Sequence, residues 1–245
     1  MREKPYWWAE PIPPGNPELA NTVANWHQSD SETHYQQIRT AMPREWWGHG
    51  LIEYSWNSLG YRGPEITSQA IKRSVVITGC SHVVGHGLAW EQTIGQQLSR
   101  RLGVPVINLG VSGSSPRFAA MLNWRLRSWA QPRAVINIWS DSARLTHWGG
   151  EVTGHLGPWN SNNSLYYEWN KDPAHCSAEL EYTRAVTRAL WPNTQYLEGT
   201  VFKSTRDQGV RFWATEDRAR DLGHIGPVTA RLIAEDLARE LIITS

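Results

Sequence analysis

The chain has 245 residues, which is enough for one domain with a buried core but short for two full domains. Its 24 Lys and Arg residues nearly balance its 23 Asp and Glu residues, and the basic ones are scattered along the chain. No charged stripe suits a nucleic acid or an anionic membrane, so we expect neither as a partner.

The first residues of the chain lack the apolar core of a secretion signal, and no stretch approaches the about 20 apolar residues that cross a bilayer. Two cysteines, Cys80 and Cys176, are too few for a disulfide framework and suit a reducing compartment. We therefore expect no signal peptide and a cytoplasmic location or, if a phage encodes the chain, a place in its virion.

Residues 1–50 are rich in Pro, Trp and polar residues, with one weakly helical stretch at 16–44. We interpret 1–50 as an N-terminal arm or cap through which the protein could assemble with others. Residues 51–245 form the main domain in this interpretation.

Strand-like and helix-like segments alternate from residue 74 onward. Runs of β-branched and apolar residues predict buried strands at 74–78, 104–109 and 134–139. Apolar residues at helical spacing predict helices at 88–102 and 116–129. This alternation is typical of a three-layer α/β/α sandwich around a parallel sheet.

The stretch 145–175 interrupts the alternation, because Gly, Asn, His and Trp follow one another there without periodicity. We expect an irregular insertion that is longer than an ordinary connection and overhangs the functional site. Its tryptophans Trp148, Trp159 and Trp169 could stack on sugar rings.

The rest of the chain predicts a helix at 178–190, strands at 196–202 and 210–214, and a last helix at 227–241. The residues of the last helix that we expect to face the core are Val228, Leu232, Ile233, Leu237 and Leu241.

Polar motifs follow the predicted strands at their carboxyl ends, where the reactive crevice of an open parallel sheet lies. In chain order they are Gly79-Cys80-Ser81-His82, the run at 108–115, and Ser140-Asp141; Asp221 and His224 then precede the last helix. A serine hydroxyl becomes a good nucleophile when an imidazole takes its proton and a carboxylate orients that imidazole. Ser81, His224 and Asp221 supply these three groups.

These motifs resemble those of the SGNH hydrolases, also called the GDSL family of esterases and lipases, over residues 54–242. Gly79-Cys80-Ser81 is similar to the family's G-D-S with Cys80 in place of the Asp, and Asp221 and His224 match its D-x-x-H. The resemblance extends to bacterial and phage-encoded members. It implies a flavodoxin-like fold and a catalytic triad of Ser81, His224 and Asp221.

The resemblance also implies an oxyanion hole that includes the backbone N–H groups of Ser81 and Gly113. In the family's G-x-N-D block, Ser140 stands where an Asn side chain would donate to the oxyanion. Ser140 is then the third donor, and Arg144 or a loop residue is a candidate to replace it.

The expected function is that of a serine esterase that hydrolyses short acyl esters, such as O-acetyl groups on carbohydrate, without metal or organic cofactor. The expected partner is a small-molecule or glycan ester, with Arg144, Trp148 and Trp159 as contacts. Two other functions stay open: a weakly active or inactive structural or glycan-binding component, for example of a virion, and a lipase or thioesterase.

Alternative site chemistries are weaker. Cys80 could be the nucleophile, but a buried small side chain is the simpler interpretation. His82 and His86 have the spacing of a helical zinc pair, yet Gly85 and Gly87 indicate a loop, so we expect them to be polar lining.

Overall fold

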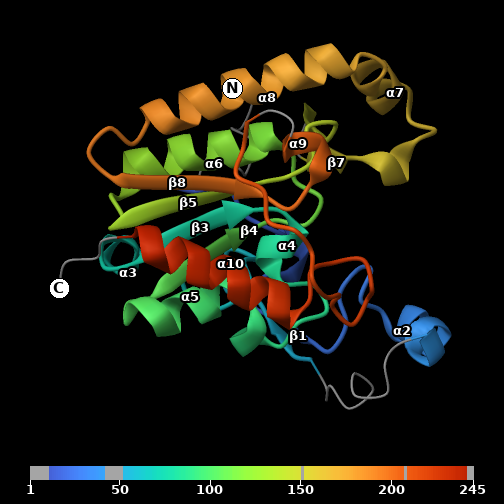
Figure 1. Cartoon of the computed structure of the whole chain (residues 1–245), viewed down its shortest axis with the longest axis horizontal. Helices are drawn as coiled ribbons and strands as arrows, with labels where there is room; N and C mark the ends of the chain where they lie inside the picture. Colours follow the sequence, from blue (N-terminus) through green and yellow to red (C-terminus); the bar gives the residue numbers. More distant parts are fainter. Residues whose placement is uncertain (1–10, 42–51, 150–151, 207–208, 242–245) are drawn as a thin grey trace, which may run out of the picture.

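In the computed structural model, residues 11–41, 52–149, 152–206 and 209–241 are described. Their centre is a parallel sheet in the order β4-β3-β5-β8, with helices on both faces (Figure 1). The strands are β3 (Val75–Gly79), β4 (Val106–Gly110), β5 (Ala134–Trp139) and β8 (Gln195–Thr200). The predicted α/β class with a parallel central sheet is confirmed.

One face of the sheet is covered by α5 (Ile94–Leu102) and α10 (Pro227–Glu240). The other face is covered by α6 (Pro116–Trp129), against which α8 (Pro173–Ala189) packs as an outer helix (Figure 1). Every residue of β3, β4 and β5 is buried, as expected of strands that are covered on both faces.

The shorter elements lie mostly at the carboxyl ends of the strands and around the N-terminal segment. The remaining α-helices are α2 (Glu32–Ile38), α3 (Ser68–Lys72), α4 (Ser81–Val84), α7 (Ser164–Asn170) and α9 (Lys203–Arg206). The 3-10 helices are Pro17–Leu19, Arg39–Ala41, Trp90–Gln92 and Pro158–Asn160. The strands β1 (Val23–Ala24) and β2 (Tyr54–Ser55) form a small antiparallel pair.

The expectation of an irregular insertion at 145–175 is wrong. β6 (Leu145–Gly149) and β7 (Val152–Leu156) form an antiparallel hairpin, α7 follows, and α8 already begins at Pro173. Asp172 caps α8 by accepting from the backbone N–H groups of Ala174 and His175, and proline at the first helical position suits the missing donor. The hairpin is too short and too rich in Gly and His for its alternation to be visible in the sequence.

Three further expectations need correction. In the described part of 16–44 the α-helix is confined to Glu32–Ile38, because Pro17 and the β1–β2 pairing interrupt any longer one. Residues 210–214 form no strand and join the sheet through one bridge between Thr200 and Phe212. In the predicted helix 88–102, regular α-helix begins only at Ile94, where the Thr93 side chain caps it.

The buried face of α10 is also rotated from the predicted one. Val228 and Leu232 are 41% and 39% exposed, whereas Ala230 and Ala234 are fully buried beside Ile233 and Leu237. Small alanines let α10 approach α5 and the sheet closely, so burial follows the packing surface rather than the largest side chains.

Candidate active site

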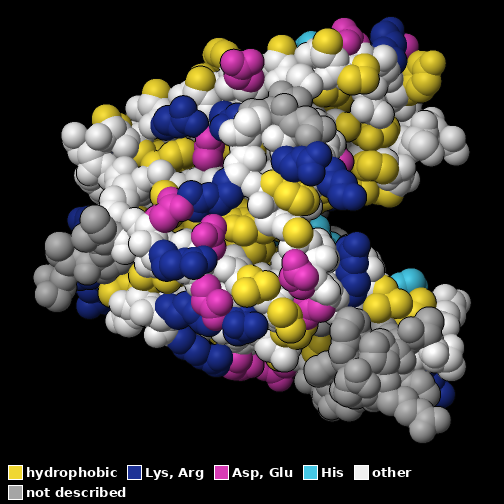
Figure 2. Space-filling model, viewed as in Figure 1, with side chains coloured by type: hydrophobic (Ala, Val, Ile, Leu, Met, Phe, Trp, Pro, Cys, Tyr) yellow, Lys and Arg dark blue, Asp and Glu magenta, His cyan; other side chains and the backbone are white. Residues whose placement is uncertain are grey.

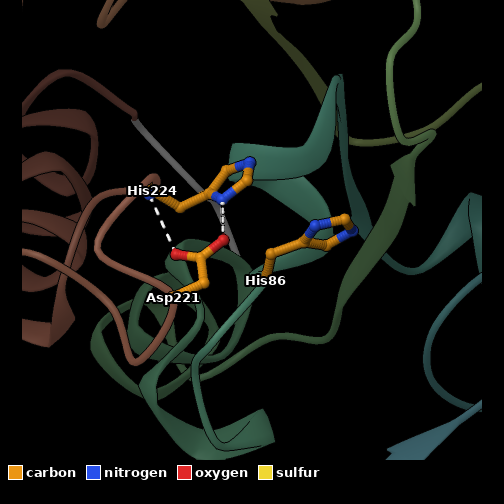
Figure 3. A group of neighbouring side chains, drawn as sticks. All are labelled: His86, Asp221 and His224. Atoms are coloured by element: carbon orange, nitrogen blue, oxygen red, sulfur yellow. Dashed lines mark hydrogen bonds and ion pairs between the residues drawn. The ribbon is translucent and has the colours of Figure 1, made fainter. Parts of the chain in front are cut away.

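Three side chains that are distant in sequence form a hydrogen-bonded chain at the carboxyl end of the sheet. The Ser81 hydroxyl lies 2.7 Å from Nε2 of His224, and Nδ1 of His224 lies 2.5 Å from Oδ2 of Asp221. Figure 3 shows the imidazole of His224 directly above the carboxylate of Asp221, with His86 beside them. The structure thus brings together the three residues that we expected to form a triad.

Local backbone structure holds Ser81 in place. It is the first residue of α4, directly after β3 and Cys80, and the single turn of α4 ends at Gly85 with a left-handed φ of 79°. Arg62 donates to the carbonyl of Gly85 over 2.7 Å, and the Asn108 side chain donates to that of Val83 over 2.6 Å. The turn that carries Ser81 is therefore fixed from two sides.

Asp221 is fixed by its own turn and is charged. Its Oδ1 accepts from the backbone N–H groups of Gly223 and His224 over 3.0 and 3.1 Å. Burial raises the pKa of Asp221, but the hydrogen bond and the charge of His224, with a hydrogen bond from Ser29, outweigh it and hold that pKa well below its usual range. The carboxylate can therefore orient the imidazole.

The N-terminal segment holds the Asp221 carboxylate in place, a role that the sequence analysis did not predict. The Ser29 hydroxyl donates to Oδ2 of Asp221 over 2.7 Å, and Nε2 of His34 lies 3.2 Å from the Asp221 carbonyl oxygen. Next to Asp221, the guanidinium of Arg220 forms a buried ion pair with Asp30, with two contacts of 2.6 and 2.7 Å to separate oxygens. Residues 26–30 are thereby joined to the segment that carries Asp221.

A pocket of about 820 Å³ opens over the Ser81 hydroxyl. One wall comes from the N-terminal segment, the floor from the turns after β3 and β4, and the other wall from the region of the β6–β7 hairpin. Figure 2 shows the molecular surface hollowed between the part that holds α7 and the part that holds α2. Its lining residues include Asn16, Glu18, Gln28, Ser29, Ser81, His82, His86, Ser112, Gly113, Phe118, Arg144, His155, Trp159, Phe202 and His224.

The hairpin is joined to the loop that follows β4. Thr146 on β6 contacts the Ser115 hydroxyl over 2.6 Å and Nδ1 of His155 on β7 over 3.0 Å. Ser115 in turn caps α6 by accepting from the backbone N–H of Phe118. These contacts set the hairpin, and with it Arg144 and Trp159, against the wall next to Gly113.

Three buried histidines of the pocket, His82, His86 and His155, are uncharged at neutral pH. Burial, and then the positive charges of His224 and Arg144, lower the pKa of His82 well below its usual value. Burial and the charges of His224 and His27 do the same for His86. Burial and Arg144 lower the pKa of His155 to about 4. No motif in the sequence singles out His155, because its burial depends on the hairpin.

A second serine lies in the same pocket. The Ser112 hydroxyl is 2.7 Å from Nε2 of His86 and 3.3 Å from Nε2 of His27. The Nδ1 atom of His86 faces the Ser29 hydroxyl at 3.5 Å, whereas that of His224 faces a carboxylate. Ser112 and His86 therefore resemble a nucleophile and its base, but without the group that orients the base.

Of the predicted oxyanion-hole residues, Gly113 lines the pocket and Ser140 does not. Gly113 lines the pocket with a left-handed φ of 73°, and a Cβ there would come within 3.2 Å of the Trp159 ring. Ser140 is buried, its hydroxyl has no hydrogen-bond partner, and it is not among the described residues that line the pocket. Cys80 is also buried and is not among them.

Only some of the predicted substrate contacts line the pocket. Trp159 and Arg144 line the pocket, and Trp159 is 54% exposed. Trp169 instead packs edge-on against His175 and is not among the lining residues. The side chain of Trp148 lies outside the described residues.

One group among the described residues has the composition of a metal site. Ligand atoms of His86, Asp221 and His224 lie within 4.8 Å of one another (Figure 3). A metal ion bound by all three would displace the hydrogen bond between Asp221 and His224, which a serine nucleophile needs.

No helix of the described residues has the length and apolar character needed to cross a membrane.

No protein-family model and no curated protein matches the chain. Among solved structures, it is similar to a GDSL-like lipase of Bacteroides ovatus, with 12% identity, a TM-score of 0.39, and coverage of 69% of this chain and 52% of the other. It is also similar to the acetyl xylan esterase Est2A of Butyrivibrio proteoclasticus, with 12% identity, a TM-score of 0.41, and coverage of 73% and 64%.

A third similar structure is that of a G-D-S-L family lipolytic protein of Desulfitobacterium hafniense, with 14% identity, a TM-score of 0.35, and coverage of 69% and 100%. The matched part of this chain therefore spans about half of the first solved protein and just under two thirds of the second.

Proposed function

We propose that the protein is a serine esterase in which Ser81 is the nucleophile, His224 the general base and Asp221 the orienting carboxylate. The observation that carries this proposal is the continuous hydrogen-bonded chain from the Ser81 hydroxyl through His224 to Asp221, with Ser81 at the floor of an open pocket. The charged carboxylate of Asp221 accepts a hydrogen bond from Nδ1 of His224, so the proton of the ring stays on Nδ1. Nε2 of the same ring is then free to accept the proton of Ser81.

In the proposed reaction, Ser81 Oγ attacks the carbonyl carbon of an ester while its proton passes to Nε2 of His224. The backbone N–H groups of Ser81 and Gly113 stabilise the oxyanion that forms. Collapse of the tetrahedral intermediate breaks the bond to the alcohol, which leaves with the proton from His224. Water then attacks the acyl-serine, His224 takes its proton and returns it to Ser81, and the acid is released.

The walls of the pocket favour a short acyl group on a carbohydrate as the substrate. Trp159 presents a half-exposed ring, and an indole stacks on the apolar face of a sugar at small entropic cost. Polar side chains such as Asn16 and Gln28 share the opposite wall, where sugar hydroxyls could find partners. A preference for long-chain esters over acetates would instead make the protein a lipase.

The test is hydrolysis of an aryl acetate by the native protein and by Ser81→Ala. We expect activity to be lost in Ser81→Ala with little change in the melting temperature, because a hydroxyl at the floor of an open pocket contributes little to the core. Cys80→Ala is the matched control on the neighbouring residue and should stay active. Activity that persists in Ser81→Ala and disappears in Cys80→Ala would show that the nucleophile is the thiol.

A further inference from the structure

Arg144 is a buried cation with unsatisfied donors on the wall of the pocket. It is 9% exposed, and its Nε and Nη1 atoms are both buried without a hydrogen-bond partner. Burial of a guanidinium is costly unless its N–H groups are paired, and buried polar groups in native proteins nearly always have a partner. Arg144 lines the same pocket as Ser81, so a bound ligand can supply that partner.

The acidic side chains in and around the site already have hydrogen-bond partners or are exposed to solvent. Asp221 is bonded to His224 and Ser29, and Oδ1 of Asp141 accepts from the backbone N–H of Ala143. Among the described lining residues, the acidic one is Glu18, which is exposed. The lowered pKa values of His82 and His155 leave both rings neutral, so Arg144 is the main positive charge of the interior wall.

Two aromatic rings hold the guanidinium in position. Its central carbon lies 5.2 Å from the ring centroid of Trp159 and 4.9 Å from that of Phe202. Aromatic contacts of this kind engage the flat faces of a guanidinium and leave its N–H groups at the edge for an acceptor. Both rings also line the pocket, so the cation and its supports form one built site.

We propose that Arg144 binds a carboxylate of the substrate, so that the preferred esters are anionic. The proposal rests on the proposed esterase function and specifies its substrate class. The carboxylate belongs either to the alcohol part, as in an O-acetylated uronic acid, or to the acyl part, as in the half-ester of a dicarboxylic acid. A pocket of about 820 Å³ has room for either beside the reacting ester.

Two matched pairs of esters test the proposal and distinguish the two sources of the carboxylate. Acetylated glucuronic acid is compared with acetylated glucose, and mono-4-nitrophenyl glutarate with 4-nitrophenyl pentanoate. We expect kcat/KM of the anionic ester to exceed that of its neutral partner in one pair by roughly ten- to a hundredfold, the worth of a hydrogen bond to a charged group. The pair that shows the preference identifies the part of the substrate that carries the carboxylate.

Variants then assign the preference to Arg144. In Arg144→Gln the ratio of the two kcat/KM values should fall to about one, and Arg144→Lys, which keeps the charge but loses the planar donors, should retain part of it. Arg231→Gln removes the same charge from an exposed position on α10 and should leave the ratio unchanged. A native ratio near one in both pairs would overturn the proposal, as would equal losses on both members of a pair in Arg144→Gln.

A binding measurement on an inactive variant tests the anion site independently of ester hydrolysis. Glucuronate, glutarate and glucose are titrated calorimetrically into Ser81→Ala, alone and combined with Arg144→Gln. If no ester is hydrolysed, the esterase proposal fails, but tighter binding of one anion than of glucose that Arg144→Gln abolishes would still establish the anion site. If neither anion binds better than glucose, the site is refuted.

Discussion

At the scale of single residues, the carboxylate of Asp221 depends on a partner that lies 192 positions away. Ser29 donates to the same oxygen that accepts from His224, so it stabilises the charged form of Asp221 and limits its rotation. We regard Ser29 as a positioning residue, because on the proposed mechanism it does not touch the reacting atoms.

Replacement of Ser29 by Ala should lower kcat by about tenfold and leave KM nearly unchanged, since the hydrogen bond that is lost orients the base and does not bind substrate. Steady-state kinetics on an aryl acetate measure both constants. Ser29→Thr keeps the hydroxyl and should restore most of kcat. An unchanged kcat in Ser29→Ala would mean that the backbone N–H groups of residues 223 and 224 suffice to hold Asp221.

Single-residue signals predicted part of this site. Ser81, Asp221 and His224 could be identified because each stands in a short motif next to a predicted element, and the structure brings them together. Ser29 and His27 stand in no such motif, and Ser112 lies in the motif at 108–115 without a signal of its own. Their proximity to the triad follows from long-range packing. Ser140 shows the limit of motif alignment, because its place in a block did not put it on the pocket wall.

At the scale of elements, the N-terminal segment and the turn that carries Asp221 behave as one unit. Asp30 and Arg220 are 1% and 4% exposed and pair through two contacts, and Arg220 stacks on Trp26 at 4.0 Å. Tyr54 on β2 donates to the same Asp30 carboxylate over 2.5 Å. Residues 1–50 therefore contribute to the proposed site through their described part.

Loss of this ion pair should destabilise the fold and the site together. Asp30→Ala leaves a buried guanidinium without its carboxylate, which costs about 3–5 kcal/mol of unfolding free energy. Urea unfolding measures that cost, and kcat should fall as well because Arg220 adjoins Asp221. Glu235→Ala, which breaks exposed pairs with Arg101 and Arg231, is the control and should change stability little. A small effect of Asp30→Ala would mean that the segment 26–30 is held by other contacts.

Elements with strong local signals agree with prediction, and those defined by pairing do not. The helix Pro116–Trp129 and the strand Ala134–Trp139 have the predicted bounds, because proline and a continuous apolar run mark them. The β6–β7 hairpin was invisible in the sequence, since its two strands are stabilised by each other and by contacts to the loop before α6. The predicted strand at 210–214 is wrong because a local apolar pattern is present without strand pairing. Its apolar residues pack beside β8, and one bridge joins them to that strand.

At the scale of the whole molecule, the buried histidines make stability depend on pH. Burial, together with the charges of Arg62 and Arg144 respectively, lowers the pKa values of His27 and His155 from 6.5 to about 4. Between these two values the unfolded chain binds protons that the folded chain does not, so the free energy of unfolding falls as pH falls from 6.5 toward 4. The slope is about 1.4 kcal/mol per pH unit for each such histidine.

Urea unfolding at pH 7.5, 6.0 and 5.0 checks this expectation. The midpoint should fall steadily below pH 6.5, and His155→Gln should make the fall less steep because one proton-binding group is removed. A midpoint that is constant or rises toward pH 5.0 would contradict the assignment of neutral, buried histidines to the folded state.

Ser81 and Ser112 of this pocket each lie within hydrogen-bond distance of a histidine, His224 and His86 respectively, and only Ser81 is the proposed nucleophile. The measurement is covalent labelling of the native protein with a fluorophosphonate, followed by mass spectrometry of the labelled peptide. We predict modification at Ser81 that is lost in Ser81→Ala, strongly slowed in His224→Gln and retained in Ser112→Ala. Labelling of Ser112, or no labelling of either serine, would contradict the account.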